Sequence, residues 1–261
     1  AIAKGGMQEC KPTTTPQDSS SIQPLESESR EPSAQYSTVV GSLIFIASNA
    51  RPDIANAVHQ VCKYMHKPTD ESWTLLKRIL RYLQGSKELW LELGGDQDNR
   101  IQLTGYCDSD WGGDLNTRKS TTGYCFTAGL GMVSWGTRQQ KTVALSTAEA
   151  EYMALSEAAK EAQWLRNLYS TLQYKQEQAT TIWEDNQSCI LLTKHNKFHM
   201  RTKHIDMRYH HIRELVESKI LAVKYKPTEE MTADILTKGL GRAKFEVHRK
   251  SLGLRYFSSL T

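Results

Sequence analysis

Cysteine is sparse in this chain, and its five cysteines show no pairing pattern. They stand far apart and form no C-x-x-C motif: Cys10, Cys62, Cys107, Cys125 and Cys189. An odd number of widely spaced cysteines argues against a disulfide framework and against a thiolate zinc site. We therefore expect the protein to work in a reducing compartment.

Long apolar runs are absent as well. The most apolar stretch, residues 39–47, is interrupted by Gly41 and Ser42 and is too short to cross a bilayer. No apolar segment of the secretory type stands at the amino terminus. The sequence therefore predicts a soluble intracellular protein without a membrane partner. Because the chain opens on Ala1 rather than on Met, a processed product and a fragment are both open interpretations.

A strong charge of one sign is also lacking. The 33 Lys and Arg residues outnumber the 29 Asp and Glu residues, so the formal net charge at pH 7 is +4. This mild excess suits a polyanionic partner, but many metabolic enzymes are equally basic, so charge alone decides nothing. A length of 261 residues is compatible with one or two domains, and we expect two.

The beginning of the chain differs in composition from the rest. Residues 11–35 are rich in Pro, Ser, Thr and Glu, and they bury too little apolar surface to offset the entropy cost of ordering. We therefore interpret residues 1–35 as a disordered linker. Over residues 36–95 apolar side chains recur at helix spacing, with one helix opening at Pro52 and another stopping at Gly85. This pattern predicts a small helical unit.

Beyond Gly95 the apolar pattern takes the period of two that is typical of strands. It predicts strand-like runs at residues 101–107, 123–128, 132–135 and 142–145, with three antiparallel strands as the simplest arrangement. There follow a long helix at 148–172, a strand at 180–183, a helix at 187–193, a basic helical stretch to 218, a strand at 221–225 and a last helix from Met231. This order predicts an α/β fold, with a mixed sheet flanked by helices over residues 96–252 and a tail at 253–261.

Four carboxylates stand where these predicted strands or helices begin or end: Asp108, Glu151, Asp185 and Asp234. Only a fold can bring together residues so far apart in the chain, and holding divalent metal is a natural reason to gather them. A hard cation such as Mg²⁺ prefers oxygen ligands, and a pair of such ions can clamp the attacking and leaving oxygens of a phosphodiester. The set therefore makes the chain a candidate nuclease.

Each of the aspartates also has an ordinary structural explanation. Asp108 and its rival Asp110 suit a turn after a strand. Asp185 suits the N-cap of the following helix. Asp234 suits the first turn of the last helix, where the helix dipole favours acidic residues in any protein. The metal interpretation therefore depends on all four carboxylates meeting at one edge of the sheet.

Helix geometry separates the two glutamates at the start of the long helix. Ser146 followed by Glu149 matches a capping box, and Glu149 heads a mostly polar row that we expect to face water. Glu151 instead heads the apolar stripe, with Leu155 and Ala158, that must pack on the sheet. A carboxylate on that stripe is costly without a metal or a cationic partner. We therefore choose Glu151 as the ligand, with a place at the wet end of the helix as the alternative.

A basic stretch follows the helix predicted at 187–193. We predict that five of its residues contact nucleic acid: Lys194, Lys197, Arg201, Lys203 and Arg208. Lys and Arg at this density can neutralise phosphates without regard to base sequence. A solvated helix face explains them equally well. A zinc site formed by His195, His199 and His204 lacks cysteines or carboxylates at ligand spacing, so we do not favour it.

Several motifs, taken in order, resemble those of one known family. They are Tyr-Cys-Asp-Ser-Asp-Trp-Gly-Gly-Asp from Tyr106, Leu-Ser-Thr-Ala-Glu-Ala-Glu-Tyr from Leu145, Glu-Asp-Asn-Gln-Ser from Glu184, Arg-Thr-Lys-His-Ile-Asp from Arg201 and Thr-Ala-Asp-Ile-Leu-Thr-Lys from Thr232. Over residues 96–252 the chain resembles the ribonuclease H domain of copia-type LTR retrotransposon Pol polyproteins. Upstream, Arg-Pro-Asp-Ile-Ala-Asn-Ala-Val and Leu-Lys-Arg-Ile-Leu-Arg-Tyr-Leu-Gln-Gly make residues 36–95 look like the carboxyl-terminal thumb and connection part of the reverse transcriptase from the same polyproteins.

The resemblance implies a ribonuclease H-like mixed five-stranded sheet and endonucleolytic hydrolysis of the RNA strand of RNA–DNA hybrids during reverse transcription. It places the family's metal-binding carboxylates on Asp108, Glu151, Asp185 and Asp234, which would hold two Mg²⁺ ions, with Mn²⁺ as a substitute. These ions would lower the pKa of a bound water, align it with the scissile phosphate and stabilise the leaving 3′ oxygen. Contacts to the 2′-hydroxyl would identify the RNA strand.

The implied partners are the RNA–DNA hybrid and the remainder of the reverse transcriptase or Pol polyprotein. The implied location is the cytoplasm, a virus-like particle or the nucleus. A catalytically silent hybrid-binding module and a degenerate transposon remnant are the alternatives.

Two departures from the family pattern qualify these expectations. Many cellular ribonucleases H carry a histidine between the last strand and the last helix, but residues 225–230 read Tyr-Lys-Pro-Thr-Glu-Glu. Two interpretations are open: turnover is slower, or Glu229 or Glu230 takes the place of the histidine. We assign no general acid. The chain also has no Tyr-x-Asp-Asp element, so we expect no polymerase activity from it alone.

Overall fold

The computed structural model describes residues 1–19, 33–94, 101–194 and 203–256, with only the backbone of residues 203–206. The chain divides into two compact units. The first, called the helical unit, comprises Ala1–Glu92 and Lys238–Thr261, and the second, called the sheet unit, comprises Leu93–Thr237. None of the described helices has the length and apolar character that crossing a bilayer requires.

Three helices make up most of the helical unit, and local capping explains where two of them begin. α1 (Ala34–Asn49) begins after Ser33, whose hydroxyl accepts a hydrogen bond from the Tyr36 amide. The short η1 (Pro52–Ile54) leads into α2 (Ala55–Cys62), which agrees with a helix opening at Pro52. α3 (Asp70–Gly85) begins with a capping box between Thr69 and Ser72 and ends at Gly85, as the sequence predicts.

A buried ion pair stabilises the turn before α2. The Arg51 guanidinium donates from Nε and Nη2 to the two carboxylate oxygens of Asp53, at 2.9 and 2.8 Å. Its Nη1 and Nη2 atoms also donate to the carbonyl and hydroxyl of Ser86, at 3.0 and 2.8 Å. The Tyr82 hydroxyl donates to the same Asp53 carboxylate. Each charge therefore has hydrogen-bonded partners, which a buried pair requires.

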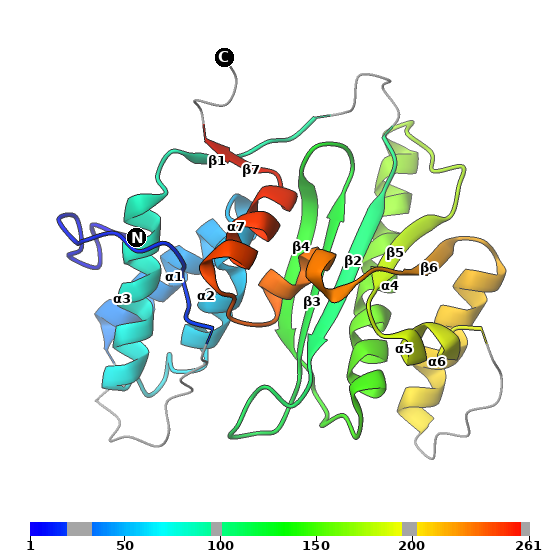
Figure 1. Ribbon diagram of the computed structural model, residues 1–261, viewed down its shortest axis with the longest axis horizontal. Coiled ribbons are helices and arrows are strands. Elements are labelled where there is room, and N and C mark those ends of the chain that lie inside the picture. The colour runs from blue at the N-terminus through cyan, green and yellow to red at the C-terminus, as the bar shows by residue number, and fades with distance from the viewer. Residues whose placement is uncertain (20–32, 95–100, 195–202, 257–261) are drawn as a thin grey trace. The chain divides into compact units, whose positions relative to one another are not determined.

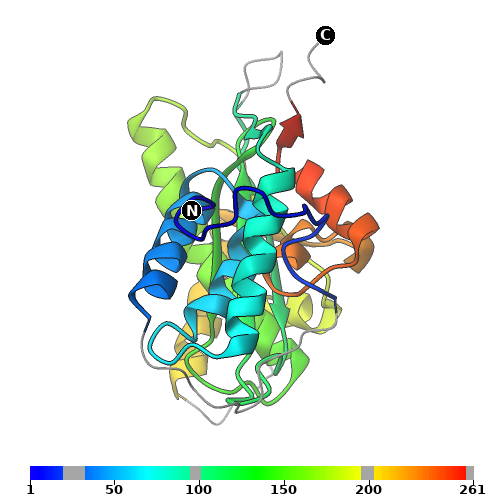
Figure 2. The ribbon, with the colours of Figure 1, turned by 90° about the vertical axis from the view of Figure 1, so that its left-hand side faces the viewer.

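The amino-terminal residues pack along α3. Figures 1 and 2 both show residues 1–19 running beside this helix. Arg81 Nε donates to the carbonyl of Lys11 at 2.7 Å, and Arg78 forms a 2.7 Å ion pair with Asp18. The prediction of a disordered linker is therefore wrong for residues 1–19. Polar side chains of α3 form hydrogen bonds and an ion pair with this segment, which has few apolar groups of its own. Residues 20–32 of the predicted linker lie outside the described residues.

The end of the chain belongs to the helical unit. β1 (Leu89–Leu91) pairs antiparallel with β7 (Leu254–Tyr256), which follows α7 (Arg242–Ser251). The sequence predicts a single domain over 96–252 and a tail over 253–261. The compact units divide differently, at Glu92 and again at Thr237, because the strand pair joins the last segment to the helical unit.

A mixed five-stranded sheet forms the centre of the sheet unit. Its strands are β2 (Thr104–Asp110), β3 (Thr121–Thr127), β4 (Met132–Gln139), β5 (Thr180–Glu184) and β6 (Leu221–Tyr225). The spatial order is β4-β3-β2-β5-β6, with antiparallel pairing among β2, β3 and β4 and parallel pairing of β2 with β5 and of β5 with β6 (Figure 1). This sheet, with its flanking helices, confirms the predicted α/β, ribonuclease H-like fold class.

The long helix α4 (Thr147–Thr171) covers one face of this sheet. Its buried stripe packs with strand residues in a core that includes Leu103, Cys107, Tyr124, Phe126, Leu155, Ala158, Leu165 and Ile182. α5 (Gln187–Leu192) and α6 (Lys203–Glu217) pack against α4 and β6. The short helix η3 (Thr232–Leu236) lies against β2 and β3. It follows η2 (Thr228–Glu230).

The strand predicted at residues 142–145 is wrong, because this segment is a loop. Side chains, rather than a neighbouring strand, form hydrogen bonds with its backbone groups. The indole Nε1 of Trp111 donates to the carbonyl of Ala144 at 3.0 Å, and the amide of Leu145 donates to the Glu149 carboxylate at 2.8 Å. Alternation of apolar residues alone does not distinguish these two arrangements.

Candidate metal centre

Two of the four candidate carboxylates lie on adjacent parallel strands. The register of β2 and β5 pairs Tyr106 with Trp183. Asp108 and Asp185 each stand two residues beyond these partners, so the strand geometry brings them to the same edge of the sheet. Asp108 lies within β2, which continues to Asp110, so the prediction that Asp108 ends the strand is wrong by two residues. Asp185 lies between β5 and α5, and the N-cap of α5 is Asn186, which excludes that structural explanation for Asp185.

The alternation of β2 directs Asp108 toward η3. Asp108 pairs with Gly123, and a Cβ at Gly123 would lie only 2.9 Å from Leu236 Cβ and 2.6 Å from Thr237 Cγ2. The missing side chain therefore lets η3 approach the sheet closely. The Thr237 hydroxyl donates a hydrogen bond to Asp108 Oδ2, and Asp108 is only 2% exposed.

Asp234 reaches the cluster from η3. It is fully buried, and it lies in a 3₁₀ helix rather than in the first turn of an α-helix. The prediction of one last helix from Met231 is therefore wrong: η3 and α7 are separate. A 3₁₀ helix of this length has little macrodipole to favour an acidic residue, so the structural explanation for Asp234 is weaker than the sequence indicates.

The two glutamates of α4 differ as the helix argument predicts, with one correction. Ser146 caps the helix by accepting from the Glu149 amide, and the Glu149 carboxylate accepts from the amide of Leu145, one residue before the cap. The first part of the row that Glu149 heads does not face water, because Glu149, Met153 and Ser156 are all buried, whereas Lys160 and Asn167 further along the row are exposed. The loop before α4 folds back over this side of the helix. The periodicity of the sequence cannot predict such a contact.

Glu151 lies on the buried stripe of α4. It is 7% exposed, and no described residue donates a hydrogen bond to its Oε2. Burial, and then the charges of Glu184, Asp108 and Asp185, raise the pKa of Glu151 well above its usual value of 4.5. Every charged group named in this shift is another carboxylate. The alternative of a wet helix end is therefore excluded.

Glu184 is a buried carboxylate that sequence reasoning missed. As the last residue of β5 it is 0% exposed, and it accepts from the Asn186 amide at 3.0 Å and from Cys107 Sγ at 3.2 Å. Burial raises the pKa of Glu184 to about 8. A signal was available in the strand, because the period of two places Glu184 on the same face as the buried Ile182.

These carboxylates form two groups that share one residue. Oxygens of Asp108, Asp185 and Asp234 lie within 4.8 Å of one another, and so do oxygens of Glu151, Glu184 and Asp185. All are hard oxygen donors, which suits Mg²⁺ or Mn²⁺, and their mutual repulsion together with the unpartnered Glu151 Oε2 is what a cation would relieve. The residues present therefore fit a divalent metal centre. All four predicted carboxylates belong to these groups.

Asp110 and the glutamates near η2 stand outside both groups. Glu230 forms a 2.9 Å ion pair with Lys226, and Glu229 is exposed. In the same segment the Thr228 hydroxyl donates to Asp185 Oδ2 at 2.6 Å. Thr228 thus takes part in orienting a cluster carboxylate.

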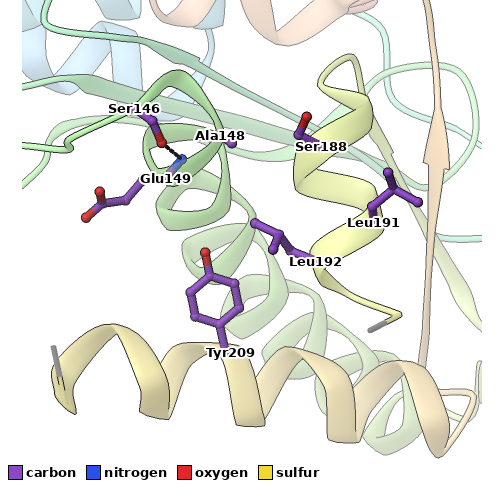
Figure 3. Close-up of a pocket in the computed structure, with 7 residues that line it drawn as sticks. All are labelled: Ser146, Ala148, Glu149, Ser188, Leu191, Leu192 and Tyr209. Carbon is purple, nitrogen blue, oxygen red and sulfur yellow. Dashed lines mark hydrogen bonds between the residues drawn. The ribbon is translucent and has the colours of Figure 1, made fainter. Parts of the chain in front are cut away.

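A hollow of about 190 Å³ lies between α4, α5 and α6. It is lined by Ser146, Ala148, Glu149, Ser188, Leu191, Leu192 and Tyr209 (Figure 3). Ala148 is one helical turn before Glu151, and Ser188 is one turn after Asp185. Figure 3 shows the Tyr209 hydroxyl directed from α6 into the hollow. This hydroxyl is buried and has no hydrogen-bond partner among the described residues.

The predicted nucleic-acid-binding residues are only partly described. Lys194 is exposed after α5, and Arg208 is half-buried on α6. Lys197 and Arg201 lie outside the described residues, as does the side chain of Lys203. The histidines of the disfavoured zinc site, His195 and His199, also lie outside, with the side chain of His204.

The chain matches transposon polyproteins over most of its length. It is 42% identical over 219 residues to the retrovirus-related Pol polyprotein from transposon TNT 1-94 of Nicotiana tabacum, a match that covers 84% of this chain. It is 37% identical over 256 residues to that from transposon RE2 of Arabidopsis thaliana, which covers 97% of this chain. The chain belongs to the retrovirus-related Pol polyproteins. It spans only 16% and 17% of these two relatives.

Two further comparisons concern this Pol segment. No protein-family model matches it. Among solved structures, LC11-RNase H1 in complex with an RNA/DNA hybrid aligns with 52% of the segment and 94% of its own chain, at 14% identity and a TM-score of 0.40. Sequence identity thus establishes the family, and the geometry of the structure separately establishes the cluster of acidic side chains.

Proposed function

We propose that this Pol segment is a divalent-metal-dependent ribonuclease H that cuts the RNA strand of RNA–DNA hybrids during retrotransposon reverse transcription. The observation that carries the proposal is the pair of carboxylate groups that share Asp185. Paired hard-oxygen sites suit in-line displacement at a phosphodiester. A module that only binds nucleic acid gains nothing from clustered negative charge beside a phosphate.

The chain's own residues have separate tasks in this proposal. Asp108, Glu151, Asp185 and Asp234 would hold two Mg²⁺ ions, for which Mn²⁺ can substitute. When bound, the ions supply the positive charge that activates water and stabilises the leaving oxygen. Thr237 and Thr228 orient two of the carboxylates through their hydroxyl donors.

Recognition of the RNA strand would come from the hollow between α4, α5 and α6. The Tyr209 hydroxyl lines this hollow and has no hydrogen-bond partner among the described residues. It could therefore bond to the 2′-hydroxyl, the group that distinguishes RNA from DNA. Phosphates along the hybrid would be neutralised by Lys194 and Arg208, and by the three other basic residues predicted from the sequence. Residues 36–95 would be the thumb and connection part of the reverse transcriptase, without polymerase activity of their own.

Cleavage of a labelled hybrid tests the proposal. The purified chain with Mg²⁺ should cut the RNA strand, leaving 5′ phosphate and 3′ hydroxyl ends, and Asp185→Asn should lower the rate by about a thousandfold or more because it removes a ligand from both groups. Asp110→Asn is the matched control, since Asp110 is an aspartate at the end of β2 that lies outside both groups, and it should retain activity. Cleavage that survives Asp185→Asn would exclude this site.

The alternative of a silent hybrid-binding module makes a different prediction. Fluorescence anisotropy with a labelled hybrid would then show tight binding while the wild-type chain produces no cleavage with Mg²⁺ or Mn²⁺. A degenerate remnant would show neither cleavage nor metal-dependent stabilisation.

A further inference from the structure

Glu184 occupies an unusual position for an acidic side chain. It is the last residue of β5, and its face of the sheet is the one that α4 covers, since Ile182 and Cys107 on that face belong to the core. It is completely buried. No Lys or Arg among the described residues forms an ion pair with it. Burial of a carboxylate without a cationic partner costs several kcal/mol in general, so a reason for its presence is needed.

The hydrogen bonds of Glu184 leave room for a further ligand. Oε1 accepts a hydrogen bond from the Asn186 amide, Oε2 accepts one from Cys107 Sγ, and the Cys189 thiol is a further hydrogen-bond donor to this carboxylate. Each carboxylate oxygen can accept about two such interactions. Three donors hold the side chain in one orientation, and the carboxylate keeps an open acceptor direction for a further ligand.

The neighbouring Glu151 supplies an independent indication of a missing cation. Its Oε2 is buried and has no hydrogen-bond partner among the described residues. An oxygen of Glu151, one of Glu184 and one of Asp185 lie within 4.8 Å of one another. Three acidic oxygens around one point, one of them unpartnered, form a site for a positive ion rather than for a proton donor from the protein.

We propose that Glu184 is a fifth carboxylate of the metal centre, which binds the second divalent cation together with Glu151 and Asp185. The first cation is then bound by Asp108, Asp185 and Asp234. Asp108 faces η3 and Glu184 faces α4, so the two groups take ligands from opposite faces of the sheet and share Asp185. This inference rests on the proposed function only in assuming that the centre binds divalent metal.

A purely structural role for Glu184 makes a different prediction. The carboxylate joins the end of β5 to the start of α5 through the Asn186 amide. A glutamine keeps the shape and one carbonyl acceptor, so Glu184→Gln would then bind metal as well as the wild type does. A ligand role predicts a specific loss of one cation site instead.

Calorimetric titration of the metal-stripped full chain with Mn²⁺ alone distinguishes the structural role of Glu184 from the ligand role. The wild type should bind two Mn²⁺ ions. Glu184→Gln should weaken one of them by about tenfold or more, while the affinity for the other stays within about twofold. The matched control is Glu161→Gln, a glutamate of α4 that bonds Ser134 at 2.6 Å, away from the cluster; it should leave both affinities unchanged. Two unaltered Mn²⁺ affinities in Glu184→Gln would overturn the inference.

A second variant keeps the inference testable if Glu184→Gln fails to fold. Glu184→Asp retains the charge on a shorter side chain, and circular dichroism checks its fold. It should bind the second Mn²⁺ more weakly than the wild type, and an unchanged pair of affinities would again overturn the inference. Hybrid cleavage is measured separately. If the wild type binds two Mn²⁺ ions but cuts no hybrid, the proposed function fails while the role of Glu184 stands.

Discussion

Removal of divalent metal should make the stability of this chain fall as the pH rises. Glu151 and Glu184 are buried and lie close to other carboxylates, so their ionisation in the folded state is opposed by burial and by repulsion from these neighbours. The unfolded chain imposes neither penalty. The folded form therefore binds protons more tightly than the unfolded form does, and its stability depends on keeping them.

The size of the effect follows from Glu184. Burial raises its pKa from 4.5 to about 8. The stabilisation is fully present below the unfolded pKa, near pH 4.5, and is lost as the pH rises through about 8. At about 1.4 kcal/mol for each tenfold change in proton affinity, this corresponds to roughly 5 kcal/mol. Typical domains are stable by only about 5–15 kcal/mol, so the loss should be large enough to measure.

Urea unfolding followed by circular dichroism measures this loss. In EDTA, the free energy of unfolding should fall by a few kcal/mol between about pH 5 and about pH 8. Glu184→Gln should flatten much of that slope, so the difference between the two proteins isolates this side chain. Millimolar Mg²⁺ should restore stability to the wild type at the upper pH, because a ligand of the folded state alone stabilises it. An equal slope in both proteins would refute the reasoning.

Three further predictions concern other parts of the molecule. Gly123→Ala should weaken Mn²⁺ binding by about tenfold without altering any ligand, because the new Cβ displaces η3; calorimetry with unchanged affinity would contradict this. Arg51→Met should lower the free energy of unfolding by about 3–5 kcal/mol in urea, because it leaves Asp53 buried and unpaired, and a loss below 1 kcal/mol would show that Asp53 finds another partner. Tyr209→Phe should lower kcat/KM for hybrid cleavage by about threefold to tenfold at unchanged melting temperature, since its hydroxyl has no partner in the described structure; a lower melting temperature at equal kcat/KM would assign it a structural role.

Local sequence signals predicted much of the secondary structure. Apolar spacing and capping residues identified α1, α2 and α3, the long α4 and the strands β5 and β6, because these elements depend on neighbours a few residues away. The choice of Glu151 over Glu149 had the same basis. It needed only the period of a helix and the cost of a carboxylate on its buried stripe.

Other features depend on contacts between residues far apart in the chain, so local sequence patterns cannot predict them. The loop at 142–145, the packing of residues 1–19 on α3 and the 3₁₀ helix that carries Asp234 are each decided by partners from other elements. Glu184 looked like an ordinary strand end, since its importance lies in its neighbours across the sheet and on α4.

By itself, then, the sequence determined most of the helices and strands and the kinds of side chain available for a metal centre. The tertiary structure alone decided that β2 lies beside β5 and that η3 closes over Gly123, which together bring Asp108, Asp185 and Asp234 within reach of one cation. The physical reason is that metal ligation requires oxygens a few ångströms apart. Only the pairing of distant strands sets such distances.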